Sequence, residues 1–224
     1  MGAAAVAVVV LLSVSACDAE NGPSTTTTTP SPPVFPYPPF EIKTDVAVPL
    51  KQPLLGAAQF AVEMSVNDRL KDDPGHGAFG RRLRGNIAPD VEIADSPPIP
   101  DNYVADTGGA FHRAVDAREL SEGTVEVSVC WYDTPGLYTK LKDGKVVGPD
   151  PNRPYSLQRP LVEWTDRPAA DGTTPSGPRW LWVGEARTYD MTRDQIAAVC
   201  EPFKPEPFVQ KMPDPMSTTV TPAP

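Results

Sequence analysis

The spacing of apolar side chains divides the chain into a helical part and a part made of strands. From Leu54 to Leu70 apolar residues recur every three or four positions, which is the period of a helix with one buried side. Pro53 suits the first turn, and the Asp-Asp-Pro-Gly sequence at 72–75 is typical of a helix end. The pattern therefore predicts a helix over residues 53–71 that packs against a sheet.

Farther along the chain the apolar period changes to two, as in strands with one buried side. Phe111, Val115 and Ala117 predict one strand, and a turn at 121–123 separates it from the next. That next strand presents Val125, Val127, Val129 and Trp131 on one side, and residues 157–165 and 180–189 predict two more strands. We interpret 75–106 and 135–154 as mostly loop, with a short helix near 79–83, a turn at Asp143-Gly144, and a helical or extended segment at 192–200. The fold class expected is α+β, with the helix on a mostly antiparallel sheet.

The beginning of the chain carries an apolar run from Ala3 to Leu12. At 1.5 Å per residue it makes about 15 Å of helix, roughly half of the thickness of a bilayer core, so it is typical of a signal peptide. The Val-Ser-Ala-Cys sequence that ends at Cys17 resembles the lipobox of bacterial lipoproteins. This resemblance implies that Cys17 carries a diacylglyceryl group, with acyl chains such as palmitate, on the outer face of the cytoplasmic membrane.

No basic residue precedes this apolar run, which leads us to expect a start codon farther upstream. The alternative is a buried Ala/Val helix with an incidental cysteine. Threonines and prolines dominate residues 18–40, which favours an extended tether of up to about 70 Å, either O-glycosylated or plain. We therefore expect a signal peptide (1–16), a lipidated tether (17–41), one α+β domain (42–207) and a disordered tail (208–224).

Two cysteines, Cys130 and Cys200, remain in a chain that we expect to be exported, and such cysteines usually pair. His76 and His112 show no metal-ligand spacing, so we expect neither a metal nor a cofactor. The net charge is -9, and the basic run at 81–84 is either a solvated helix face or turn, or an anion site. Nucleic acid is not an expected partner.

The motifs of the strand region resemble those of a known group of proteins. The Thr124–Asp133 segment, the turn Asp143-Gly144-Lys145, the Arg159–Glu163 and Arg179–Trp182 segments, and Cys200 resemble exported actinobacterial proteins with a nuclear transport factor 2-like cone. The resemblance implies a curved sheet around a helix, with a pocket inside. Enzymes of this kind, SnoaL-type cyclases and ketosteroid isomerases, carry Asp, His or Tyr in that pocket. The candidates here are His112, Asp116, Tyr132, Asp133 and Glu163.

Strand alternation puts His112 and Asp116 on one side of their strand, opposite Phe111 and Val115, facing either a pocket or solvent. The tryptophans are expected in the core rather than stacked on a ligand. The main functional hypothesis is a non-enzymatic envelope lipoprotein that binds a partner protein, an envelope polymer or an apolar ligand. The alternatives are a pocket enzyme of the isomerase or cyclase type and a phage-encoded lipoprotein that excludes superinfecting phage.

Overall fold

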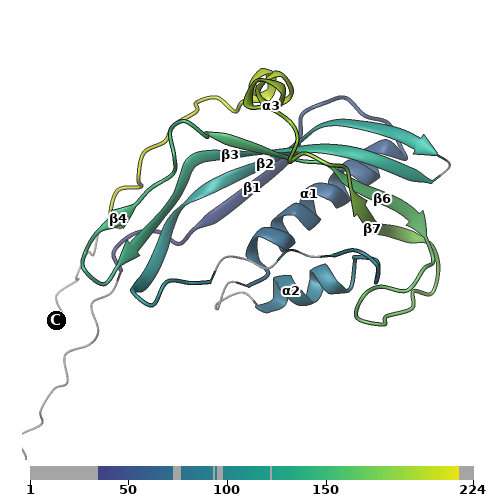
Figure 1. Cartoon of the computed structure of the whole chain (residues 1–224), viewed down its shortest axis with the longest axis horizontal. Coiled ribbons are helices and arrows are strands. Elements are labelled where there is room, and N and C mark those ends of the chain that lie inside the picture. The colour runs from purple at the N-terminus through teal and green to yellow at the C-terminus, as the bar shows by residue number, and fades with distance from the viewer. Residues whose placement is uncertain (1–34, 73–76, 93, 95–97, 122, 217–224) are drawn as a thin grey trace, which may run out of the picture. The chain divides into compact units, whose positions relative to one another are not determined.

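The computed structural model describes residues 35–72, 77–92, 94, 98–121 and 123–216, all within one compact unit, Phe35–Pro224. The expectations for the signal peptide, for lipid on Cys17, for the tether up to residue 34, for His76 and for residues 217–224 lie outside the described residues. Figure 1 shows the arrangement of the helices and strands. Their bounds are β1 Glu41–Val46, α1 Leu54–Leu70, α2 Gly77–Arg84, β2 Tyr103–Ser121, β3 Thr124–Leu141, β4 Val146–Val147, β5 Tyr155–Gln158, β6 Pro160–Thr165, β7 Arg179–Glu185, α3 Arg193–Cys200 and the 3-10 turn η1 Glu201–Phe203.

The strands form one mixed sheet with the order β1-β2-β3-β6-β7, and β4 and β5 also pair with β3. The pairs are antiparallel except for β1 and β2, which run parallel. The sheet does not close on itself, because β1 and β7 lie at the two ends of this order. The predicted α+β class, with a helix on a mostly antiparallel sheet, is confirmed, whereas the cone-like fold that the sequence resemblance implied stays a prediction.

Helices cover the two sides of the sheet (Figure 1). On one side α1 presents four small apolar residues, Ala57, Ala58, Ala61 and Val62, to Val125, Val127 and Val129 of β3. On the other side α3 brings Cys200 against Tyr132, Leu157 and Val115. The predicted helix, the short helix near 79–83 and the valine side of β3 are therefore confirmed. The arginines of α2 are exposed while Leu83 is buried, as expected for a solvated helix face.

A bulge in β2 overturns the predicted relation between His112 and Asp116. Ala114 pairs with Val129 and Asp116 with Ser128, so one extra residue stands between the two pairs. Such a residue shifts the alternation of side chains by one position. His112 therefore faces α1, where it is buried, while Asp116 is exposed. The prediction that they share a side is wrong.

The two central strands are longer than predicted, because glycines allow them to continue where the sequence suggested loops. β2 begins at Tyr103 and β3 continues to Leu141. The strands meet at Gly108 and Gly136, whose φ angles are 98° and 96°, and a Cβ on Gly108 would collide with the carbonyl oxygen of Gly136. The loop predicted at 135–154 is thus partly strand, and the expected strand at 157–165 is divided into β5 and β6.

A disulfide fixes the C-terminal segment to the side of the sheet that α3 covers, opposite α1. Cys130 of β3 and Cys200 of α3 are bonded, with an S–S distance of 2.03 Å, as the sequence predicted. Thr192 caps α3, since its side chain accepts a hydrogen bond from the backbone N–H of Gln195. Beyond α3 the chain makes a hydrogen bond between the Val209 backbone and the Thr134 hydroxyl at 3.2 Å. Its last described contact is the backbone N–H of Met216 on the carbonyl of Pro36.

Candidate functional site

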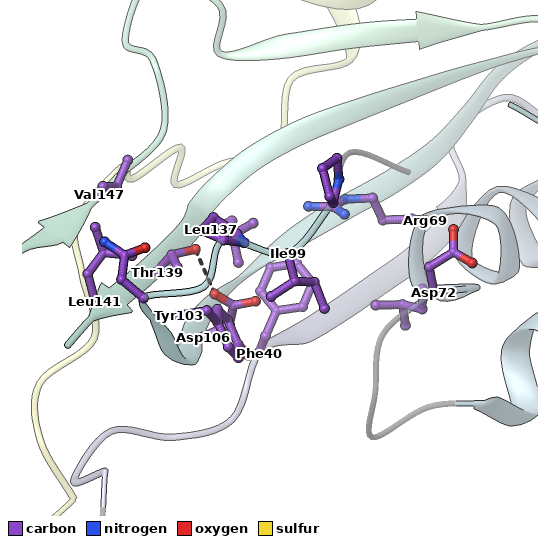
Figure 2. A pocket seen from close by; sticks show the side chains of 14 residues that line it. Phe40, Arg69, Asp72, Ile99, Tyr103, Asp106, Leu137, Thr139, Leu141 and Val147 are labelled. Atoms are coloured by element: carbon purple, nitrogen blue, oxygen red, sulfur yellow. Dashed lines mark hydrogen bonds between the residues drawn. The ribbon is translucent and has the colours of Figure 1, made fainter. Parts of the chain in front are cut away.

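A pocket of about 450 Å³ opens beside the C-terminal end of α1 (Figure 2). Four separate segments form it: the residue before β1, the end of α1, the segment that leads into β2, and the far half of the β2–β3 hairpin with β4. Its apolar lining consists of Phe40, Leu70, Pro98, Ile99, Pro100, Leu137, Leu141 and Val147. Its polar lining consists of Arg69, Asp72, Asn102, Tyr103, Asp106 and Thr139. A mostly apolar wall with a few polar groups is typical of small-molecule sites.

A second, smaller pocket of about 250 Å³ adjoins the first. Phe40, Arg69, Leu137, Thr139 and Val147 line both. The smaller pocket adds Ala110, Trp131, Asp133, Gly148 and Pro149. Together the two pockets form a mostly apolar hollow, in which Arg69 lines both parts and Asp133 lines the smaller one.

Arg69 is held in place by an aromatic side chain below it. Its guanidinium carbon lies 4.9 Å from the centre of the Trp131 ring, within the range of a cation–π contact. Figure 2 shows the side chain extending from α1 toward the strands, with the hydrogen bond from Thr139 to Asp106, 2.6 Å long, on the strand wall. The stacking fixes the guanidinium at the boundary of the two pockets.

His112 lies beside Trp131 on the neighbouring strand and takes part in a chain of hydrogen bonds. Its ring lies 5.0 Å from that of Trp131, its register partner on β3. The Ser65 hydroxyl lies 2.8 Å from His112 Nδ1 and donates to Gln158 Oε1, also at 2.8 Å. Since that hydroxyl has only one proton, His112 Nδ1 must be the donor to Ser65. Gln158 Nε2 in turn donates to Asp68 at 3.2 Å.

The buried surroundings of His112 keep its imidazole neutral. Burial, together with the nearby charge of Arg69, lowers the pKa of the imidazole to about 3. His112 Nε2 is buried and has no hydrogen-bond partner among the described residues. His112 does not line either of the two pockets, whereas its neighbour Trp131 lines the smaller one. The side chain therefore belongs to the support beneath the site.

Asp133 is the one sequence candidate that lines the smaller pocket. Burial raises the pKa of its carboxyl above the ordinary value, and the positive charge of Arg69 opposes that shift. Its backbone N–H bonds to the Pro154 carbonyl at 2.9 Å, which fixes the strand at this point. Asp133 thus supplies an acceptor, and Arg69 supplies donors, in the same small pocket.

The other candidates lie elsewhere. Tyr132 is buried on the α3 side of the sheet, where its hydroxyl donates to the Cys200 carbonyl at 2.6 Å. Glu163 lies on β6 and pairs with Arg167 at 3.6 Å. Asp116 is exposed beyond the bulge of β2. The five candidates thus do not converge on one pocket, and no acid–base pair is formed from them.

Arg69 was missed by reasoning from the sequence, and so were the apolar walls. Arg69 sits within the predicted helix as one of several charged residues near its end, which gives no signal of its own. Leu137, Leu141 and Val147 fell in a segment interpreted as loop. Trp182, by contrast, is buried, and Trp180 packs against the core beside α1, as predicted, whereas Trp164 is 52% exposed and Trp131 lines the smaller pocket.

Within the part of the chain that the structure describes, no helix has the length and apolar character needed to cross a membrane. The same described residues contain no group of three or more His, Cys, Asp or Glu side chains that could hold a metal ion. No family model matches the chain, and neither the curated proteins nor the solved structures include a match.

Proposed function

We propose that this chain is an envelope lipoprotein, tethered through Cys17, whose folded domain binds an apolar small molecule. The observation that carries the proposal is the pocket of about 450 Å³ with apolar walls at the end of α1. Its size falls in the range of roughly 300–1,000 Å³ that is common for ligand sites. This favours the apolar ligand over the partner protein and the envelope polymer that the main hypothesis named with it.

The exposed residues at the rim of the pocket also favour an apolar ligand. Ile99 and Val147 line the pocket and are still 45% and 47% exposed. Large aliphatic side chains at a pocket mouth lose contact with water when an apolar ligand enters, and each buried methylene contributes about 0.8 kcal/mol. A ligand that covers both side chains therefore gains part of its affinity at the rim.

The tether is tested separately from the pocket. We expect a Cys17→Ser variant to move from the membrane fraction to the soluble fraction of the expressing bacterium, because the thiol is the proposed site of the lipid. The intact mass of membrane-extracted wild type should correspond to a chain that begins at Cys17 and carries acyl groups. A mass that retains Met1 would contradict this part of the proposal.

Binding is tested with N-phenyl-1-naphthylamine, an uncharged probe that fluoresces in apolar surroundings. We expect Ile99→Asp to weaken binding of this probe at least about tenfold, since the new carboxylate would lose water when the pocket fills. Leu120→Asp is the matched control, because Leu120 is 48% exposed on β2 and lies outside the pocket. Equal weakening in both variants, or no binding by wild type, would contradict an apolar site here.

A further inference from the structure

The smaller pocket is lined by two side chains of opposite charge, next to the apolar walls that it shares with the larger pocket. Arg69 lines both pockets, and Asp133 lines the smaller one. The two side chains are close enough for the charge of Arg69 to act on the pKa of Asp133. A ligand whose apolar part lies along Ile99, Leu137 and Val147 would bring its polar end to this pair.

A charged head group that enters the smaller pocket would lie close to a side chain of the same charge. An anion that approaches Arg69 also approaches Asp133, and Asp72 and Asp106 line the larger pocket behind it. A cation that approaches Asp133 meets Arg69. Attraction and repulsion between unit charges depend on distance in the same way, so the like charge offsets part of the attraction to the opposite charge.

An uncharged head group that both donates and accepts avoids this conflict. The guanidinium of Arg69 donates to the acceptor atom of the head group. The Asp133 carboxylate accepts from the N–H or O–H of the same head group. Among the described residues none donates a hydrogen bond to the Asp133 carboxylate, so this acceptor is available to a ligand. The Trp131 ring beneath Arg69 holds the guanidinium in position, which reduces the entropy that binding must remove.

We propose that Arg69 and Asp133 select apolar ligands with an uncharged head group that offers both a donor and an acceptor, such as a primary amide. The inference rests on the proposed ligand-binding function and names the class of ligand. The apolar chain contributes affinity in the larger pocket, and the charged pair discriminates among head groups of the same chain length.

The test compares decanamide, decanoate and decylamine as competitors that displace N-phenyl-1-naphthylamine from the full chain at pH 7. We expect decanamide to bind at least about tenfold more tightly than either charged competitor. Asp133→Asn should raise the affinity for decanoate about tenfold relative to that for decanamide, because it removes the negative charge and keeps the shape of the side chain. Arg69→Gln should likewise raise the affinity for decylamine about tenfold relative to that for decanamide, because it removes the positive charge.

Two variants serve as controls, Arg81→Gln on α2 and Glu119→Gln on β2, because each removes one exposed charge outside the two pockets. Both should keep the wild-type order of the three competitors. Wild type that binds decanoate or decylamine as tightly as decanamide would overturn the inference, and so would variants that weaken all three equally. In those cases the apolar site itself would still stand, whereas failure of all three competitors to displace the probe would overturn the proposed function as well.

Discussion

Replacing Cys130 and Cys200 together by alanine is expected to lower the free energy of unfolding by about 4 kcal/mol. The bond joins residues 70 positions apart, and a cross-link over that distance removes much of the conformational freedom of the unfolded chain. Both cysteines are fully buried, so the double variant also loses packing between α3 and β3. Guanidinium unfolding of wild type and variant, followed by circular dichroism, measures the difference.

The reducing agent dithiothreitol supplies the control for this expectation. It should destabilise wild type under unfolding conditions and leave the alanine variant unchanged, because only wild type contains the bond. Hydrogen exchange should at the same time become faster for the backbone amides of α3, which loses its covalent link to the sheet. A loss of stability below about 1 kcal/mol would show that the disulfide contributes little to the fold.

His112 is expected to make the protein progressively less stable as the pH falls below 6.5. In the unfolded chain the imidazole takes up a proton near pH 6.5, whereas in the folded protein its pKa is lowered to about 3. Between these values the unfolded state binds more protons, so the free energy of unfolding falls by about 1.4 kcal/mol for each pH unit. The stabilisation is complete above pH 6.5 and is lost as the pH approaches 3.

The comparison with His112→Gln isolates this contribution. Glutamine retains a donor for the Ser65 hydroxyl and does not titrate, so the slope of stability against pH should decrease by that amount. The carboxyls of Asp133 and Glu185 have raised pKa values and give a slope of the opposite sign, but they are present in both proteins and cancel. Identical slopes between pH 4 and 6.5 would mean that His112 is accessible to protons in the folded state.

The local sequence predicted those elements in which apolar residues recur with a regular period. The helix at Leu54–Leu70 and the valine side of β3 follow from the period of their apolar residues, and the disulfide follows from the two cysteines left in a chain expected to be exported. Asp133, a candidate that only the resemblance implied, lines the smaller pocket, but the cone-like pocket of that resemblance stays a prediction. For these features the relevant contacts follow from neighbours along the chain or from the chemistry of a single residue type.

The site itself depends on tertiary structure. The bulge at Val115 reverses the side on which Asp116 lies, and no local pattern marks it, because a bulge is decided by pairing with the neighbouring strand. The glycine contact between β2 and β3 turns an apparent loop into a pocket wall. Arg69 and Asp133 are 64 positions apart in the sequence (133 − 69) and line one pocket because the end of α1 lies over β3, where Arg69 stacks on Trp131. The sequence by itself thus determined α1, the valine side of β3 and the disulfide, whereas the packing of the chain decided β1, β4, the far half of the β2–β3 hairpin and which charges share one pocket, because a pocket is formed by segments that are distant along the chain.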